Sequence, residues 1–202
     1  MSRRQARHRG IAMTDEVTFR PVAPDCWEDF ERLFESRGGP KTCWCMAWRS
    51  MEEVPTAERP AVAKKCEMKR RISSGEPVGL LGYINSEPVA WCSVAPRSSY
   101  RASMSDVKPG DEKQEIWSIA CFFVSRPWRG QGMFQQLIAA AEDYAGKSGA
   151  TMLEAYPVDP DSPSYRFGGY LPAFAQVGYA SCGRKGVRRH IVRKTLSRNQ
   201  AK

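Results

Sequence analysis

Glycines and arginines cluster directly after an apolar run, in a segment suited to binding an anion. Gly130 and Gly132 lie in a short turn between residues 116–124, which are almost all apolar, and a helix predicted to begin near Gly132. Arg126 and Arg129 flank the turn. Backbone N–H groups at a helix N-terminus lack helical partners, and the helix dipole favours negative charge there. The sequence therefore predicts a phosphorylated ligand at this turn.

Three kinds of phosphate-binding turn compete as interpretations of this segment. A Walker loop requires the pattern GxxxxGK[ST], which the sequence lacks. A dinucleotide-binding turn requires GxGxxG early in a βαβ unit, whereas here the third glycine is missing and the strand comes late in the chain. The third interpretation fits, because the hexapeptide "RGQGMF" resembles the RxxGxG/A motif of the GNAT acetyltransferase superfamily.

The resemblance extends over most of residues 16–196. It is carried by the segments "VAWCSVAPR", "IWSIACFFV", "LEAYPVD" and "RFGGYLPAFAQVGY", which are similar to a bacterial subgroup of GNAT proteins with no settled substrate. The resemblance implies an α/β (α+β) GNAT fold, in which helices flank a single mixed central sheet. A strand at 115–124, a helix from Gly132 and a strand at 151–156 would form its parallel crossover, which is right-handed in nearly all proteins.

The resemblance also implies a co-substrate, acetyl-CoA, and transfer of its acetyl group to an amine. The amides of residues 130–134 would hold the pyrophosphate, and the pantetheine would pair with the end of the central strand. The implied coenzyme A-binding residues are Phe122, Phe123, Val124, Arg129, Gly130, Gln131, Gly132, Met133 and Phe134.

Two positions depart from the pattern of the family. Phe134 stands where a small residue is usual, and we expect only a local adjustment of helix packing. Many members carry a tyrosine acid near the fourth helix, at a position that is Phe174 here. Because phenylalanine cannot donate a proton to the departing thiolate, Tyr170 and Tyr165 are the candidate acids. Alternatively no acid is needed, since an ordinary thiol has a pKa of about 8.5.

Acetylation of an amine calls for a base, because the attacking nitrogen must be neutral while an alkyl ammonium has a pKa of about 10.4. Glu115, at the head of the central strand, is close to where some family members carry a catalytic glutamate. It is explained equally well as an exposed carboxylate at a strand end. Glu154, within "MLEAY", is the second candidate, and burial would raise its pKa if it faces inward. A backbone N–H of the central strand is the expected donor to the thioester carbonyl.

The acceptor site is predicted in the segment "CWCMAWR", between the first two predicted helices. Trp44, Cys45 and Trp48 could form an aromatic wall for a small-molecule amine, although packing of a loop against the sheet explains them equally well. Cys43 and Cys45 lack the CxxC spacing and the further ligands of a structural zinc site, so no metal is predicted. A fold does not by itself determine the substrate.

Hydrophobic periodicity predicts the elements that position these residues. They are a strand at 17–22, a helix at 26–38, a helix from about Thr56, a hairpin at 77–84 and 88–95, a polar loop at 97–114, the crossover described above, a short helix near 170–176 and a hairpin at 179–183 and 188–194. Asp25 is predicted to cap the first helix and Gly38 to end it. Pro60 is expected in the first turn of the second helix.

Length and composition fit one domain with a sizeable core, since 42% of the 202 residues are apolar. We expect a disordered basic extension at residues 1–13, which lacks the apolar stretch of a signal peptide, and a single acetyltransferase domain at 14–202. No run of about 18 apolar residues suggests a membrane span. Seven cysteines, an odd number without a secreted spacing pattern, favour reduced thiols in a cytoplasmic protein.

The net charge of +9 leaves a second class of function open. Basic residues cluster in "SRRQARHR", "KKCEMKRR" and "GRKGVRRHIVRK". The alternative is a coenzyme A-binding module with weak or lost catalysis that contacts nucleic acid or a protein through this basic surface. Phe174 favours the alternative, whereas the glycine turn and the strand carboxylates favour an active enzyme. No nucleic-acid-binding motif accompanies the clusters, so nucleic acid is not the expected partner, and we expect a monomer or a homodimer.

Overall fold

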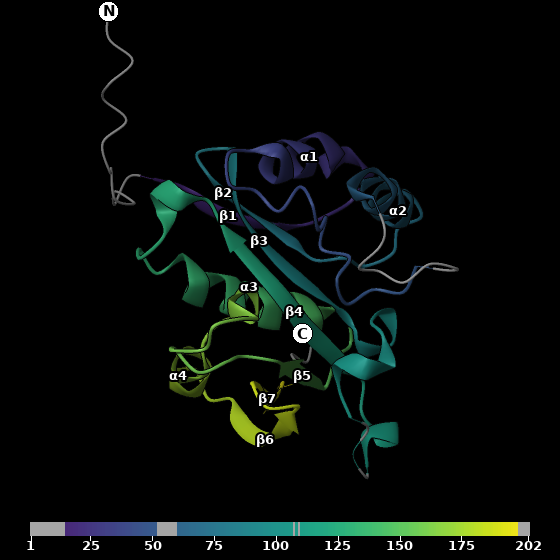
Figure 1. Ribbon diagram of the computed structural model, residues 1–202, viewed down its shortest axis with the longest axis vertical. Helices are drawn as coiled ribbons and strands as arrows, with labels where there is room; N and C mark the ends of the chain where they lie inside the picture. The colour runs from purple at the N-terminus through teal and green to yellow at the C-terminus, as the bar shows by residue number, and fades with distance from the viewer. Residues whose placement is uncertain (1–14, 52–59, 107, 109, 198–202) are drawn as a thin grey trace, which may run out of the picture.

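The computed structural model describes residues 15–51, 60–106, 108 and 110–197. Within them, seven strands form one mixed sheet in the order β1-β2-β3-β4-β5-β7-β6 (Figure 1). The strands are β1 (Val17–Pro21), β2 (Leu80–Ile84), β3 (Glu87–Pro96), β4 (Ile116–Val124), β5 (Met152–Ala155), β6 (Ala180–Lys185) and β7 (Arg189–Thr195). The helices are α1 (Trp27–Glu35), α2 (Ala61–Ser73), α3 (Met133–Lys147) and α4 (Leu171–Gln176). The predicted extension at 1–13 lies outside the described residues, as does the predicted helix start at Thr56.

The parallel crossover predicted from the sequence is confirmed. β4 and β5 pair in parallel from Ile116 with Met152 to Ile119 with Ala155, and α3 connects them. The two predicted hairpins are also present, since β2 pairs antiparallel with β3 and β6 with β7. The sequence did not predict that β7 would lie between β5 and β6. This arrangement lets the last hairpin extend the sheet beyond the parallel pair.

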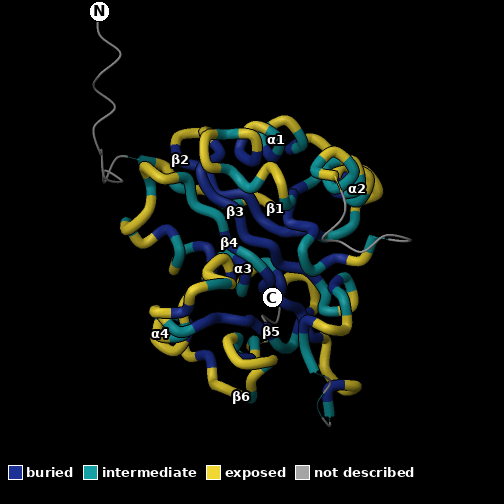
Figure 2. Tube along the Cα trace, in the orientation of Figure 1, coloured by how far each residue is buried: buried dark blue, intermediate teal, exposed yellow. Residues whose placement is uncertain are grey.

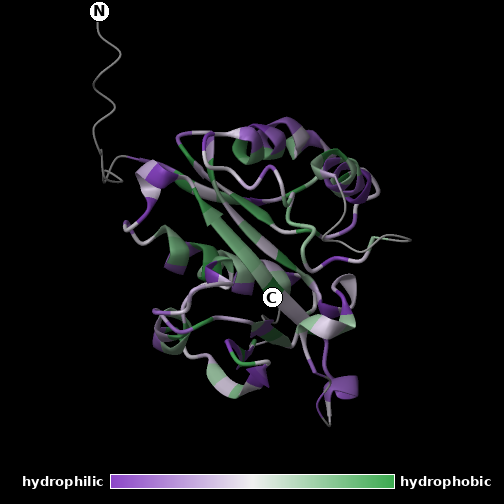
Figure 3. Cartoon of the chain, in the orientation of Figure 1, coloured by the Kyte–Doolittle hydropathy of each residue, from purple (hydrophilic) through white to green (hydrophobic). Residues whose placement is uncertain are grey.

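Two apolar layers cover the sheet, one on each face (Figures 1 and 2). Helices α1 and α2 pack on one face around Trp91, whereas α3 packs on the other face around Leu137 and Ile119. Because successive side chains of a strand point to opposite faces, a strand covered on both faces is largely apolar, as β4 is apart from Ser118. Figure 3 shows this contrast between apolar strands and the hydrophilic outer surfaces of the helices. Among the described helices, none combines the length and the apolar character needed to cross a membrane.

Helix ends differ from the predictions. Cys26, not Asp25, is the N-cap of α1 and makes no side-chain cap bond, because the chain enters this helix through a 3-10 turn at Pro24–Cys26. The Asp25 carboxylate instead pairs with the Arg20 guanidinium at 3.0 Å. The helix ends at Glu35, before the predicted Gly38. Pro60 is the N-cap of α2 rather than part of its first turn.

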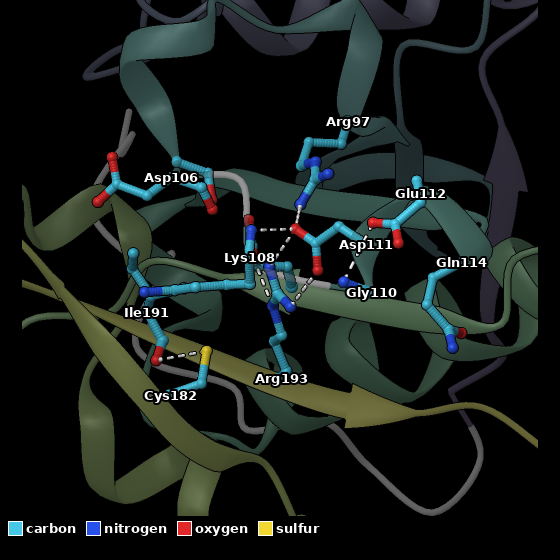
Figure 4. Close-up of polar contacts among 12 residues, drawn as sticks. Arg97, Asp106, Lys108, Gly110, Asp111, Glu112, Gln114, Cys182, Ile191 and Arg193 are labelled. Atoms are coloured by element: carbon cyan, nitrogen blue, oxygen red, sulfur yellow. Dashed lines mark hydrogen bonds and ion pairs between the residues drawn. The ribbon is translucent and has the colours of Figure 1, made fainter.

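A buried ionic network connects the loop after β3 to strand β7 (Figure 4). The Asp111 carboxylate accepts hydrogen bonds from Arg97 Nη1 at 2.6 Å, from Arg193 Nη1 and Nη2 at 2.7 and 3.0 Å, and from the Lys108 amide at 2.9 Å. Arg193 Nε in turn donates to Glu154 at 2.6 Å. The two carboxylates, Asp111 and Glu154, and the two guanidinium groups, Arg97 and Arg193, therefore compensate one another's charges within the network.

Candidate active site

The sheet opens where β4 continues beyond β5. The parallel pair ends at Ile119 and Ala155, so no described strand lies beside the last residues of β4 on that side. The register with β3 shifts at the same point: Ser93 faces Cys121 while the next residue of β3 faces Ile119, which leaves Ala120 as an extra residue. A bulge of this kind bends the strand and increases its local twist. It therefore widens the opening and exposes a strand edge there.

The glycine turn stands at the mouth of this opening. Gly130 and Gly132 have φ values of +74° and +78°, a left-handed conformation that favours glycine. A Cβ atom on either residue would meet nothing within 4 Å, so the space in front of the turn is empty of protein. Gly132 is the N-cap of α3 and provides no side chain to satisfy the first amides of the helix. Arg129 Nε donates to the Val124 carbonyl at 2.8 Å and fixes the turn to β4.

A groove of about 870 Å³ runs from this turn along the end of β4. It is lined by Phe122, Phe123, Val124, Trp128, Arg129, Gly130, Gly132, Met133, Phe134, Gln135, Arg166, Phe167, Gly169, Tyr170 and Ala173. Eight of the nine predicted coenzyme A-binding residues are among them. The ninth, Gln131, lies in the same turn and donates from Nε2 to the Pro127 carbonyl at 2.8 Å. The structure thus brings the predicted set together at a groove with two cationic side chains, Arg129 and Arg166.

Phe134 fits because a facing glycine makes room for it. Its ring packs 4.5 Å from the ring of Phe122 and 5.8 Å from that of Phe174, measured between centroids. A Cβ atom at Gly169 would clash with the Phe134 ring. The larger residue at this motif position is therefore matched by the absence of a side chain on the opposite wall of the groove.

Neither predicted carboxylate lines the groove. Glu115 is exposed at the head of β4, seven residues from Phe122, which corresponds to about 23 Å along a strand. Glu154 is fully buried, and each of its two carboxylate oxygens accepts a hydrogen bond, one from Arg193 and one from the Tyr156 hydroxyl. Glu154 thus belongs to the ionic network. The position of either glutamate gives no support to its predicted role as base.

The tyrosines near α4 differ in their access to the groove. Tyr170 lines it and is 38% exposed, so its hydroxyl is available to a ligand. Tyr165 lies against the neighbouring loop, with its ring 6.2 Å from that of Trp48. Phe174 is fully buried in the core and does not reach the groove. Tyr170 therefore remains the better placed of the two candidate acids.

We expect Tyr170→Phe to lower kcat about tenfold and to leave the KM for acetyl-CoA nearly unchanged. A positioned acid contributes to the rate when the thiolate leaves but adds little to ground-state binding. The measurement is steady-state kinetics on a verified amine. The control is Tyr144→Phe, whose ring packs against Trp117 near the C-terminal end of α3 and outside the groove. A kcat equal to that of the unaltered protein would contradict the role.

The predicted acceptor loop closes a second, apolar cavity of about 180 Å³. Its lining consists of Pro40, Cys43, Cys45, Ala47, Trp48, Trp91, Ala120, Cys121, Phe122, Phe123 and Phe167. Of the three residues predicted for the acceptor site, Cys45 and Trp48 line this cavity. Trp44 does not, because its buried ring stacks on Phe34 in the layer under α1. Although three thiols line the cavity, the described residues include no group of three or more His, Cys, Asp or Glu arranged to hold a metal ion.

Several lining residues were not predicted. Arg166 and Phe167 come from a segment after β5 that the sequence showed only as a loop, and Cys121 and Trp91 were read as core strand residues. Phe167, like Phe122, lines both the groove and the cavity. The alternation of side chains along β4 is the sequence signal that could have identified Cys121. Cys121 and Phe123 point to the face covered by α1, opposite to Phe122.

Comparison with known proteins supports this geometry. The model of the Acetyltransferase (GNAT) family matches residues 40–168, more than half of the chain. The chain belongs to the GNAT acetyltransferase family. The matched residues contain β4, the glycine turn, α3 and β5, and most of the residues that line the groove. No curated protein matches the sequence.

Solved structures share the GNAT fold at low sequence identity. A GNAT family acetyltransferase from Listeria monocytogenes 4b F2365 aligns with a TM-score of 0.59 and 12% identity over 89% of this chain and 95% of that one. A polyamine N-acetyltransferase from Drosophila melanogaster gives a TM-score of 0.57 and 11% identity over 90% and 100%. An N-acetyltransferase from Staphylococcus aureus Mu50 gives 0.54 and 10% over 90% and 99%. At these identities the likeness shows the fold alone.

Proposed function

We propose that this GNAT protein transfers the acetyl group of acetyl-CoA to a primary amine of a small molecule. The observation that carries the proposal is the junction of the groove and the apolar cavity at Phe122, Phe123 and Phe167. A donor in the groove and an acceptor in the cavity would meet at the end of β4. Such proximity accounts for much of the rate of a two-substrate reaction.

The groove residues fit a coenzyme A thioester, which supplies the activated acetyl group. The amides that follow Gly130 and Gly132 face open space at the start of α3, and Arg129 and Arg166 add positive charge for phosphates. The free edge of β4 at Phe122–Val124 offers backbone groups to the amides of the pantetheine. The apolar cavity favours an amine carried on an apolar group, because its lining side chains are apolar apart from the three thiols.

The test is release of free thiol from acetyl-CoA in the presence of a library of amines. We expect turnover with small primary amines that carry an apolar group, and none with peptides too large for the cavity. Binding of coenzyme A without thiol release for any amine would instead support the alternative of a binding module with lost catalysis.

The seven cysteines, none of which forms a disulfide, fit the proposed cytoplasmic location.

A further inference from the structure

Three thiols line the apolar cavity, and one of them accepts a hydrogen bond from an indole N–H. Cys43 and Cys45 come from the loop after α1, and Cys121 comes from β4. The Cys45 sulfur accepts a hydrogen bond from Trp91 Nε1 at 3.2 Å, whereas the Cys121 thiol donates to the Phe122 carbonyl at 3.7 Å. A donor directed at the sulfur favours its anionic form, because hydrogen bonds to a charged acceptor are stronger than those to a neutral one.

A buried cation without a carboxylate partner adds positive charge to the surroundings of the same sulfur. Arg49 is fully buried, and its partners among the described residues are the Val78 carbonyl at 2.8 Å, the hydroxyls of Ser93 and Tyr100 at 3.3 and 3.2 Å, and the face of the Tyr100 ring at 4.5 Å, all of them neutral. Its Nε and Nη1 atoms have no partner among the described residues. An uncompensated buried charge is costly, so the site favours an anion nearby. Cys45 is the group on this loop that can provide it.

The backbone at this point is also unusual. Trp44 and Cys45 have φ values of +47° and +54°, two consecutive non-glycine residues in the left-handed region. Each such residue costs on the order of 1 kcal/mol and persists only where its surroundings hold it. The buried ring of Trp44 anchors this turn in the core, and the turn directs Cys45 between Trp91 and the cavity.

We propose that Cys45 is held as a thiolate in the apolar cavity and acts there as the general base that deprotonates the acceptor amine. This role rests on the proposed function, in which the cavity holds the acceptor. The described residues that line the cavity include no carboxylate and no histidine. A thiolate at Cys45 is therefore the proton acceptor that the cavity itself provides.

The titration of the thiols agrees with this geometry. The interaction with the Cys121 thiol, together with Trp91 and Arg49, outweighs burial and lowers the pKa of Cys45 to about 7. Burial and the interaction with Cys45 raise the pKa values of Cys43 and Cys121, which stay protonated. The titratable and charged groups that interact electrostatically with Cys45 are Cys43 and Arg49 of its own loop, Cys92 of β3, Tyr100 after β3, and Cys121 of β4. The α1 helix contributes only aromatic rings.

The proton balance of the reaction is complete with this assignment. The Cys45 thiolate takes one proton from the substrate ammonium and becomes a thiol, which leaves a neutral amine. A bond forms from the amine nitrogen to the acetyl carbon, and the bond from that carbon to the coenzyme A sulfur breaks. The departing thiolate takes a proton from the Tyr170 hydroxyl, which recovers the second proton of the nitrogen, and Cys45 returns its proton to solvent. The net products are the amide, coenzyme A thiol and one proton.

The first experiment measures the thiolate directly on the unaltered protein. Iodoacetamide is small enough for the cavity, and mass spectrometry of peptides gives its rate of reaction with each cysteine as a function of pH. We expect the rate at Cys45 to be half-maximal near pH 7, with the exposed Cys66 in the same samples as the reference. A Cys45 profile centred near the usual thiol pKa of about 8.5, or no reaction at any pH, would overturn the proposal whether or not the protein is active.

The second experiment measures kcat/KM against pH with an amine from the library. Cys45→Ala is expected to lower kcat/KM about 100-fold and to remove the inflection near pH 7, while the affinity for coenzyme A stays within twofold. Cys66→Ala on α2 is the matched control and should retain the full profile. A Cys45→Ala profile like that of the unaltered protein would overturn the role. So would an acetylated Cys45 that accumulates with acetyl-CoA alone, because this residue would then be a nucleophile.

Discussion

Replacement of Gly132 by valine is expected to weaken coenzyme A binding at least about 100-fold. The glycine has a φ of +78°, and a Cβ atom there would project into open space at the start of α3. In the proposed complex this space holds the pyrophosphate, so the valine side chain would stand between the phosphate oxygens and the helix amides. The phosphates would lose both the hydrogen bonds and the close approach to the positive end of the helix dipole.

Isothermal titration calorimetry with coenzyme A measures this effect, and a second glycine provides its control. Gly75, at the end of α2, has a φ of +75° and equally open surroundings, so Gly75→Val carries the same backbone strain away from the groove. We expect both variants to lose a similar amount of stability and only Gly132→Val to lose affinity. Full affinity in a folded Gly132→Val protein would refute the placement of the pyrophosphate.

Replacement of Asp111 by asparagine is expected to lower the free energy of unfolding by about 3 kcal/mol at pH 7. The carboxylate is almost fully buried and accepts hydrogen bonds from Arg97, from both Nη atoms of Arg193 and from the Lys108 amide. Removing one partner of a buried ion pair leaves the other charge uncompensated, which costs several kcal/mol. Asparagine keeps the size of the side chain, so the loss reports charge and hydrogen bonding rather than a cavity.

The same carboxyl gives the stability a defined dependence on pH. Burial alone would raise the pKa of Asp111, but the hydrogen bonds from Arg193, the Lys108 amide and Arg97 outweigh it and hold the pKa below its usual range. A lowered folded pKa stabilises the protein above the unfolded value of about 3.9, and this contribution is lost as the pH falls toward the folded pKa. The gap in stability between the unaltered protein and Asp111→Asn should therefore narrow below about pH 4.

Urea unfolding at several pH values tests both statements about Asp111. The matched control is Asp143→Asn, which breaks a pair with Lys147 on the outer surface of α3 where both side chains are more than half exposed. Exposed pairs contribute little, so this variant should change stability by less than about 0.5 kcal/mol at any pH. Equal effects of the two substitutions would show that burial of the network adds nothing to the free energy of unfolding.

Local signals were sufficient for most elements and for the groove that we propose binds coenzyme A. The apolar run of β4, the two left-handed glycines and the helix after them are contiguous, so one short stretch of chain specifies strand, turn and helix together. The groove depends on this stretch, and residues 122–124 and 129–134 were therefore predicted as a set. Boundaries such as the start of α1 were less accurate, because the 3-10 turn before it has no distinct sequence signal.

Residues whose role depends on distant partners could not be assigned in the same way. Glu154 looks like a catalytic carboxylate in sequence, but Arg193, 39 positions later, pairs with it after β7 inserts beside β5. Glu115 was predicted to open the central strand, but it lies one residue before β4, at the end away from the groove. The spacing of residues in the sequence gives neither the order of strands in a sheet nor which distant side chain will pair with a buried carboxylate.

The sequence by itself determined a GNAT fold with a glycine turn between an apolar strand and a helix, because these features arise from neighbouring residues. Only the tertiary structure decided which side chains share the apolar cavity. Cys45, Trp91 and Cys121 are separated by 46 and 30 positions, and they meet because the bulge in β4 and the left-handed turn at Cys45 direct them to one point. These contacts depend on the register of the sheet and on the burial of Arg49. Both are properties of the folded molecule and not of any one segment of the sequence.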